Sequence, residues 1–161
     1  MNKEIQKKIE DWKFIQNLAF DVLKMLSDEQ LGFIVGKNMG TLGAQFRHMA
    51  RVRFQYSEAI ETKRVDHTIE RIDPAIATST DKLVDLWEKS NRKLLNVLQK
   101  INPHELENTM IDWKYWSIDE MNIHDHINVL MDHETLHSGQ IIVYLRTMEL
   151  KFPKSWEAWG L

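Results

Sequence analysis

The sequence carries four long segments in which apolar residues recur every three or four positions, the spacing of one face of an α-helix. These segments cover about residues 3–26, 41–61, 80–100 and 118–148. Only 6 glycines and 3 prolines interrupt the 161 residues, which is too few for the many turns of an all-β chain. The pattern therefore predicts an all-α protein, a four-helix bundle with long connections that forms a single domain over residues 1–161.

Local signals set the expected ends of these helices. Thr41 is placed to cap the second helix, and Pro103 follows the end of the third. Ser117 with Glu120 has the spacing of a capping box, so we expect the last helix to begin there. Residues 27–40 show no helical stripe and are expected to form a loop or a short turn. Connections of about 18 and 14 residues follow the second and third helices, longer than the usual two to eight, and they leave room for a crossover.

Composition excludes several kinds of site and partner. The chain has no cysteine, so disulfides, thiolate metal sites and cysteine nucleophiles are excluded. A formal net charge of −3 provides no basic field for a nucleic-acid backbone. No segment approaches the roughly 20 apolar residues that span a bilayer, and the charged, amphipathic start is unlike a signal peptide. We expect a cytoplasmic protein that acts on a small molecule.

The last helix holds a pair of histidines, His133 and His137, with Glu134 between them. Residues four apart on a helix have Cβ atoms roughly 5–6 Å apart, so both imidazoles can bind one divalent ion at about 2.0–2.1 Å. His137 interrupts an apolar stripe, and a buried imidazole needs partners that a shared metal would provide. A third ligand must come from elsewhere. Of the remaining histidines, only His48 lies on another helix beside an apolar face, and we take it as the third ligand.

Two other classes of site share parts of this motif. His-Glu-x-x-His is the zincin protease pattern, in which Glu134 would be the general base. The extended zincin pattern fails here, because Gly139 follows His137 by two residues rather than three and no histidine comes after it. Glu134 with His137 also matches half of a di-iron carboxylate site, but no second Glu-x-x-His exists. A mononuclear three-histidine site remains.

Two runs of the sequence resemble one known group of proteins. The segment at 41–50 reads TLGAQFRHMA, and the segment at 133–141 reads HETLHSGQI. Together they resemble the DinB/YfiT-like superfamily, whose members are four-helix bundles with one histidine on the second helix and a His-x-x-x-His pair on the last. The resemblance covers nearly the whole chain and implies His48, His133 and His137 as metal ligands.

Two positions depart from the pattern of the superfamily. Many members have Arg after the last ligand, where this chain has Ser138, and many have His four residues before the pair, where this chain has Val129. Neither is a ligand position. The departures therefore leave the metal site in place but leave the subfamily and the substrate open.

Three neutral imidazoles leave a divalent ion with at least one open position, which is the design of a catalytic site. Zinc or nickel suits such ligands. The resemblance implies a thiol S-transferase that joins a low-molecular-weight thiol to an electrophile, and it implies a homodimer. Other relatives point to a metal-dependent isomerase or hydrolase. A non-catalytic, stress-linked metal-binding bundle is the further alternative.

Several neighbours of the ligands have candidate roles. Glu134 is a candidate general base, or it could accept a hydrogen bond from a ligand. Gln45, Gln140 and Tyr144 lie within a helical turn of a ligand and could orient it. Gly139 costs about 1 kcal/mol relative to Ala in mid-helix, which the close approach of another helix would explain.

Two further sets of side chains each have two interpretations. Arg47, Arg51 and Arg53 are expected to form a solvated face, or else to hold an anionic substrate near the site. Three aromatic residues, Trp113, Tyr115 and Trp116, are expected to pack over the end of the core, or else to wall a substrate pocket. The site also predicts a pH dependence, because ligation requires neutral imidazole and an ordinary pKa near 6.5 implies weaker binding below about pH 6.

Overall fold

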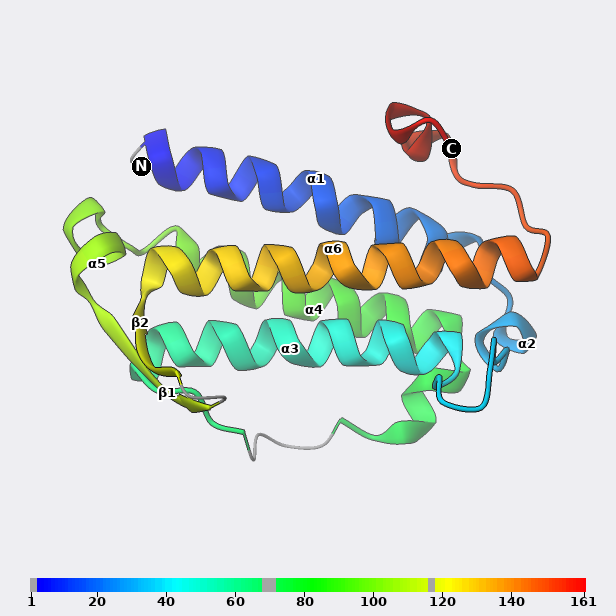
Figure 1. The fold of residues 1–161 in the computed structure, drawn as a ribbon, viewed down its shortest axis with the longest axis horizontal. Coiled ribbons are helices and arrows are strands. Elements are labelled where there is room, and N and C mark those ends of the chain that lie inside the picture. Colours follow the sequence, from blue (N-terminus) through cyan, green and yellow to red (C-terminus); the bar gives the residue numbers. More distant parts are fainter. Residues whose placement is uncertain (1–2, 68–71, 116–117) are drawn as a thin grey trace.

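The computed structural model describes residues 3–67, 72–115 and 118–161, and four long helices dominate it (Figure 1). These are α1 (Lys3–Met25), α3 (Leu42–Thr62), α4 (Thr80–Leu98) and α6 (Ile123–Thr147). The prediction of a mostly helical chain is confirmed. No helix in the described ranges has the length and apolar character needed to cross a membrane.

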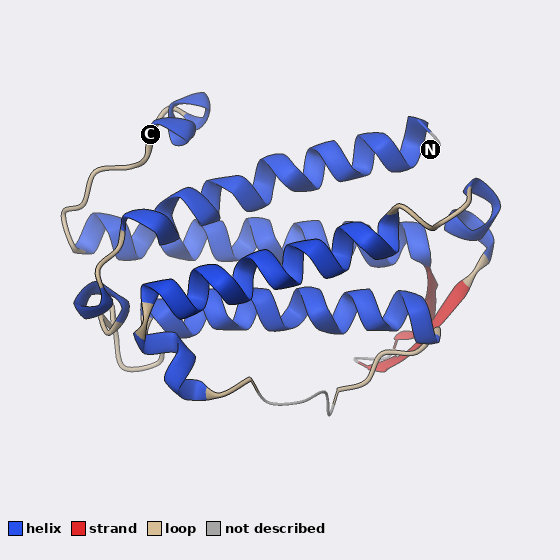
Figure 2. Ribbon diagram, turned by 180° about the vertical axis from the view of Figure 1, so that it is seen from behind, coloured by secondary structure: helices blue, strands red, loops and turns tan. Residues whose placement is uncertain are grey.

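The four long helices pack side by side, with α1 and α3 each in contact with both α4 and α6. α1 and α6 run in one direction along the molecule, and α3 and α4 run in the other (Figures 1 and 2). Because α3 and α4 are parallel neighbours, the chain between them must return along the length of the molecule. This return is the expected crossover, and it ends in the short 3-10 helix η1 (Pro74–Thr78).

Both remaining connections contain more structure than the sequence indicated. The first holds a short helix, α2 (Asp28–Leu31), which Ser27 begins with a capping box. The second holds α5 (Pro103–Asn108) and the strand β1 (Met110–Tyr115). The all-α prediction therefore has to be corrected, because β1 pairs antiparallel with a second strand, β2 (Ile118–Asn122).

The predicted start of the last helix is wrong by five residues. Residues 118–122 form β2, and α6 begins at Ile123, where the Asn122 side chain accepts a hydrogen bond from the Asp125 amide at 2.8 Å. The expected cap, Ser117, and its neighbour Trp116 lie outside the described residues. Capping signals occur at both places in the sequence, and pairing with β1 decides between them, because it supplies backbone hydrogen bonds to residues 118–122.

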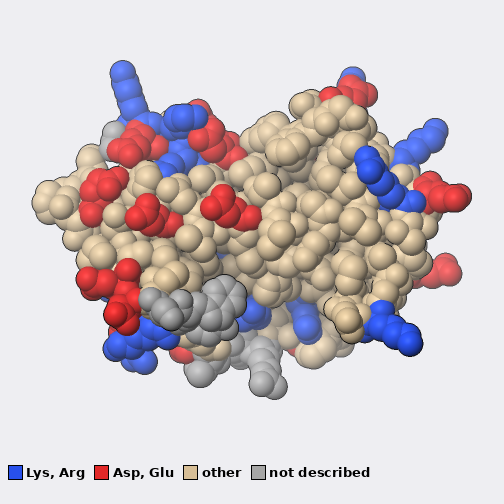
Figure 3. Space-filling model, in the orientation of Figure 1, with Lys and Arg blue, Asp and Glu red and all other residues tan. Residues whose placement is uncertain are grey.

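Two glycines in the long helices have opposite surroundings. A Cβ on Gly43 would lie 1.9 Å from the Ala77 carbonyl oxygen, so α3 and η1 can touch only where a side chain is missing. A Cβ on Gly139 would meet no described atom within 4 Å. The expectation that another helix of the chain approaches Gly139 is therefore wrong. Gly139 is exposed, as are Leu136 and Val143 on the same helix, and few charged side chains lie over this half of α6 (Figure 3).

A layer of buried polar side chains lies between two apolar clusters of the core. At its centre are Arg53 of α3 and Glu134 of α6, each with 0% of its side chain exposed. Arg53 Nε donates to Glu134 Oε1 at 2.5 Å, and Arg53 Nη2 donates to Glu134 Oε2 at 3.1 Å. The expectation of a solvated arginine face is therefore wrong for Arg53, because a buried carboxylate gives its charge a partner inside the core.

Every long helix contributes to this polar layer. Trp12 of α1 donates its indole N–H to Glu134 Oε1 at 3.3 Å. Asn91 of α4 accepts a hydrogen bond from Arg53 Nη1 at 2.9 Å, and the guanidinium carbon lies 3.6 Å from the centroid of the Trp87 ring. The layer therefore ties α1, α3, α4 and α6 together at one level of the molecule.

The two glycines give a matched pair of substitutions. Gly43→Ala should lower the free energy of unfolding by about 1–3 kcal/mol, because the new methyl group collides with the η1 backbone. Gly139→Ala should raise it by about 1 kcal/mol, because the helix gains propensity without a clash. Urea unfolding followed by circular dichroism measures both changes. Effects of the same sign at the two positions would contradict the packing described here.

The buried ion pair predicts non-additive substitutions. Arg53→Met should lower the free energy of unfolding by about 3–5 kcal/mol, because it leaves the Glu134 carboxylate buried without a counter-charge. The double variant Arg53→Met with Glu134→Leu should regain most of that loss, because apolar pairs often replace buried ion pairs without cost. Denaturant unfolding of both single variants and the double variant completes the cycle, and additive losses would show that the two charges are not coupled.

Candidate metal centre

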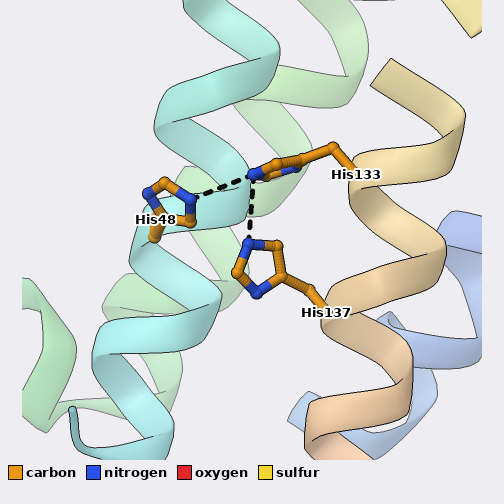
Figure 4. A group of neighbouring side chains, drawn as sticks. All are labelled: His48, His133 and His137. Carbon is orange, nitrogen blue, oxygen red and sulfur yellow. Dashed lines mark hydrogen bonds between the residues drawn. The ribbon is translucent and has the colours of Figure 1, made fainter. Parts of the chain in front are cut away.

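His48 of α3 points toward His133 and His137 of α6 (Figure 4). The Nε2 atom of His133 lies 3.0 Å from His48 Nε2 and 3.0 Å from His137 Nε2. One ring nitrogen of each histidine lies within 4.8 Å of the others, so the cluster could hold a metal ion. The structure thus brings together the three histidines that the sequence pointed to.

The ends of the two helices place these rings at the same level. The Thr41 hydroxyl accepts a hydrogen bond from the Ala44 amide at 3.1 Å and starts α3, as predicted, about two turns before His48. On α6, the two other histidines follow one another by one helical turn on the side that faces α3. The site is therefore built from regular helix on both sides, without loop residues.

The spacing of the nitrogens fits a common ion. Two imidazole nitrogens at about 2.0–2.1 Å from a metal lie about 2.9 Å apart when they subtend a right angle, and about 3.3–3.4 Å apart in tetrahedral geometry. The observed distances of 3.0 Å fall between these values. Each of these two contacts therefore matches a pair of imidazoles that share one divalent ion, and positions away from the three rings would stay open.

Burial keeps the cluster uncharged. Burial, together with repulsion from Arg51, Arg47 and any charge on His137, lowers the pKa of His48 to about 4. Burial likewise lowers the pKa of His133 to about 3 and lowers that of His137. The expectation that protons compete with the metal below about pH 6 must therefore be corrected toward about pH 4.

Gln140 is the polar neighbour best placed to orient a ligand. The Nδ1 atoms of His133 and His137 and the Oε1 atom of Gln140 are buried, and no described residue makes a well-formed hydrogen bond to them. Gln140 nevertheless lies close enough to His137 for its hydrogen-bonding influence to offset part of the fall in that pKa. This proximity is consistent with the role expected for Gln140, that of orienting a ligand.

The two other expected neighbours lie away from the histidine rings. The Tyr144 hydroxyl donates to the carbonyl oxygen of Gly40. Gln45 lies beside that hydroxyl, where its side chain opposes the rise in the tyrosine pKa caused by burial. Both residues therefore belong to the packing between the start of α3 and the end of α6.

Glu134 faces the core rather than the cluster. Its two carboxylate oxygens are held by Arg53 and Trp12, and the side chain is fully buried. This environment suits a residue that fixes α6 better than one that exchanges protons with a substrate. Sequence reasoning missed Arg53 as its partner, although a charged residue that continues an apolar line on α3 is the signal that could have found it.

His126 has partners of its own in the core. Its Nδ1 accepts from the Trp113 indole at 3.1 Å, and its Nε2 lies 3.1 Å from the Tyr56 carbonyl oxygen, to which it donates. Burial lowers its pKa to about 4. His126 is therefore a neutral core histidine that fastens the antiparallel pair β1–β2, called the hairpin below, to α3 and α6.

A cavity of about 570 Å³ opens beside His48 and His133. Its walls combine α3, α6, the two strands and His67, and most of the lining surface is apolar. They include Val52, Tyr56, Trp113, Met121, Val129 and Leu136. Trp113 thus fulfils both of its expected roles, since it packs on the core and walls the cavity.

Comparison with known proteins assigns the family. A DinB family model matches residues 1–153. Two crystal structures share the fold: a DinB-like protein (YjoA) of Bacillus subtilis, with a TM-score of 0.74 and 14% identity over 92% of this chain and 97% of that one; and a DinB-like protein of Bacillus cereus ATCC 10987, with a TM-score of 0.76 and 21% identity over 92% and 95%. At these identities the likeness shows the fold alone. No curated protein matches the chain. Because the family model spans nearly its whole length, the chain belongs to the DinB family.

Proposed function

We propose that this protein is a metal-dependent enzyme that joins a low-molecular-weight thiol to an electrophile, with His48, His133 and His137 holding one divalent ion. The observation that carries the proposal is the convergence of three uncharged Nε2 atoms beside an open cavity. Ligands on one side only are typical of catalytic rather than structural metal sites. Zinc or nickel suits a set of ligands made of imidazoles alone.

The surroundings of the cluster favour thiol chemistry over hydrolysis. An ion held there would lower the pKa of a thiol or a water molecule bound at its open position. A thiol starts from a pKa of about 8.5 and water from about 15.7, so the thiol needs far less help from a protein base. The carboxylate of Glu134 is already engaged by Arg53.

The chain's own residues would position the second reactant. Tyr56 and Trp113 offer aromatic surface, and Leu136 adds an aliphatic wall on the α6 side. These side chains suit an electrophile with an apolar body.

The proposed ligands predict a clear pattern of metal content. The wild-type protein should bind about one Zn²⁺ or Ni²⁺ per chain. His48→Ala should weaken binding by more than about 100-fold, as should His133→Ala, because even residues that only orient a ligand cost 10–100-fold when removed. His104→Ala, at an exposed position on α5, is the control. Equilibrium dialysis with elemental analysis measures the content, and full retention by His48→Ala would remove it from the site.

The same variants test the reaction. The metal-loaded wild-type protein should consume a small thiol in the presence of an apolar electrophile, and His48→Ala and the metal-stripped protein should not. Thiol loss is followed with a colorimetric thiol reagent. Cleavage of an ester or amide without loss of thiol would favour the hydrolase alternative. Metal binding without turnover of either kind would favour a non-catalytic protein.

Metal affinity should change little between pH 8 and about pH 5 and fall steeply below about pH 4. The ligand pKa values are lowered to about 4 for His48 and about 3 for His133, so protons displace the metal only at that acidity. In the unfolded chain the three histidines have ordinary pKa values near 6.5, so they take up protons at a higher pH than they do in the folded protein. The metal-free protein should therefore lose stability as pH falls from about 6.5 toward about 4. Metal-buffered titrations test the affinity, and a tenfold loss between pH 7 and pH 6 would contradict the lowered pKa values.

A further inference from the structure

Arg51 is a half-buried cation that lies beside the histidine cluster and has no acidic partner among the residues that the structure describes. It lines the cavity, and its Nη2 atom lies 3.4 Å from His48 Nδ1. No ion pair between described residues includes it. The neighbouring arginines differ, since Arg53 is paired with a carboxylate and Arg47 Nη1 lies 3.4 Å from the Ile72 carbonyl oxygen, to which it donates.

The contact between Arg51 and His48 depends on where the histidine carries its proton. A guanidinium has donors only, so the contact requires a lone pair on His48 Nδ1 and therefore a proton on Nε2. Binding of a metal through Nε2 requires the other tautomer, with the proton on Nδ1. In that tautomer the two groups are both donors and cannot bond to each other. A metal ion at the cluster would thus deprive Arg51 of the acceptor it has here.

We propose that Arg51 is the anion-binding residue of this site, and that it takes the carboxylate of a small thiol whose sulfur binds the metal. This inference rests on the proposed metal-dependent function. A carboxylate fits the planar fork of donors that a guanidinium offers, and the apolar walls around it strengthen a charge-assisted hydrogen bond. The three ligands carry no negative charge of their own. The ligand class is therefore a low-molecular-weight thiol with a carboxylate a few bonds from the sulfur.

Asp132 is the one described acidic residue in the cavity wall, and it is the rival partner for Arg51. It is exposed, and it makes no ion pair with Arg51 in the described structure. Exposed ion pairs contribute little, because water solvates both charges. An incoming carboxylate would therefore compete well with Asp132 for the guanidinium.

The test compares two thiols on the Co²⁺-loaded protein. 3-Mercaptopropionate and 2-mercaptoethanol are similar in size and differ in the carboxylate, and cobalt–thiolate absorption reports the binding of each. The wild-type protein should prefer 3-mercaptopropionate by about tenfold or more. Arg51→Gln should reduce that preference to near one while changing the affinity for 2-mercaptoethanol less than about twofold. Arg51→Lys should keep part of it, because the charge remains but the planar fork is lost.

Two controls and one further measurement separate the outcomes. Arg47→Gln, one turn away on α3, and Asp132→Asn should both keep the preference. Arg51→Gln should bind Co²⁺ at least as tightly as the wild-type protein, because it no longer favours the tautomer that opposes ligation. An equal preference in Arg51→Gln and wild type would overturn the inference and leave the metal site standing. A wild-type protein that binds no Co²⁺ would overturn the proposed function, and the inference with it.

Discussion

The buried ion pair between Arg53 and Glu134 is the interaction on which the arrangement of this protein depends. A charge left alone in the core would cost several kcal/mol, so α3 and α6 cannot slide or turn against each other without a large loss of stability. The same alignment of the two helices sets His48 opposite the histidines on either side of Glu134. The geometry of the cluster is thus a consequence of how two charges are satisfied in the core.

The histidine cluster and the cavity wall draw on different parts of the chain. Regular helix on α3 and α6 supplies all three histidines, whereas the hairpin supplies Trp113 and Met121 to the cavity wall. His126 joins the two parts, because it bonds to both the hairpin and α3. Residues that would select the ion and residues that would select the organic reactant can therefore change independently.

Periodicity located the long helices because each buries one stripe, and the spacing of His133 and His137 is itself a local helical property. The features that sequence reasoning missed are set by distant contacts. The start of α6 moves to Ile123 because residues 118–122 pair with β1. The place of Arg53 on an apolar line of α3 indicates burial, but its partner is a carboxylate on another helix that no neighbouring residue identifies. Gly43 matters only because η1 passes over it.

The polar layer between the two apolar clusters has a consequence for how the protein would acquire its ion. Trp12, Asn91, Arg53 and Glu134 join all four long helices, and none of them belongs to the histidine cluster. The helices are thus held in place by groups that the chain itself provides. Binding of the metal ion would therefore follow folding, and a chelator that removes the ion would leave a folded protein that can bind another. The occupant of such a site would be decided by the relative supply of zinc and nickel around the finished protein.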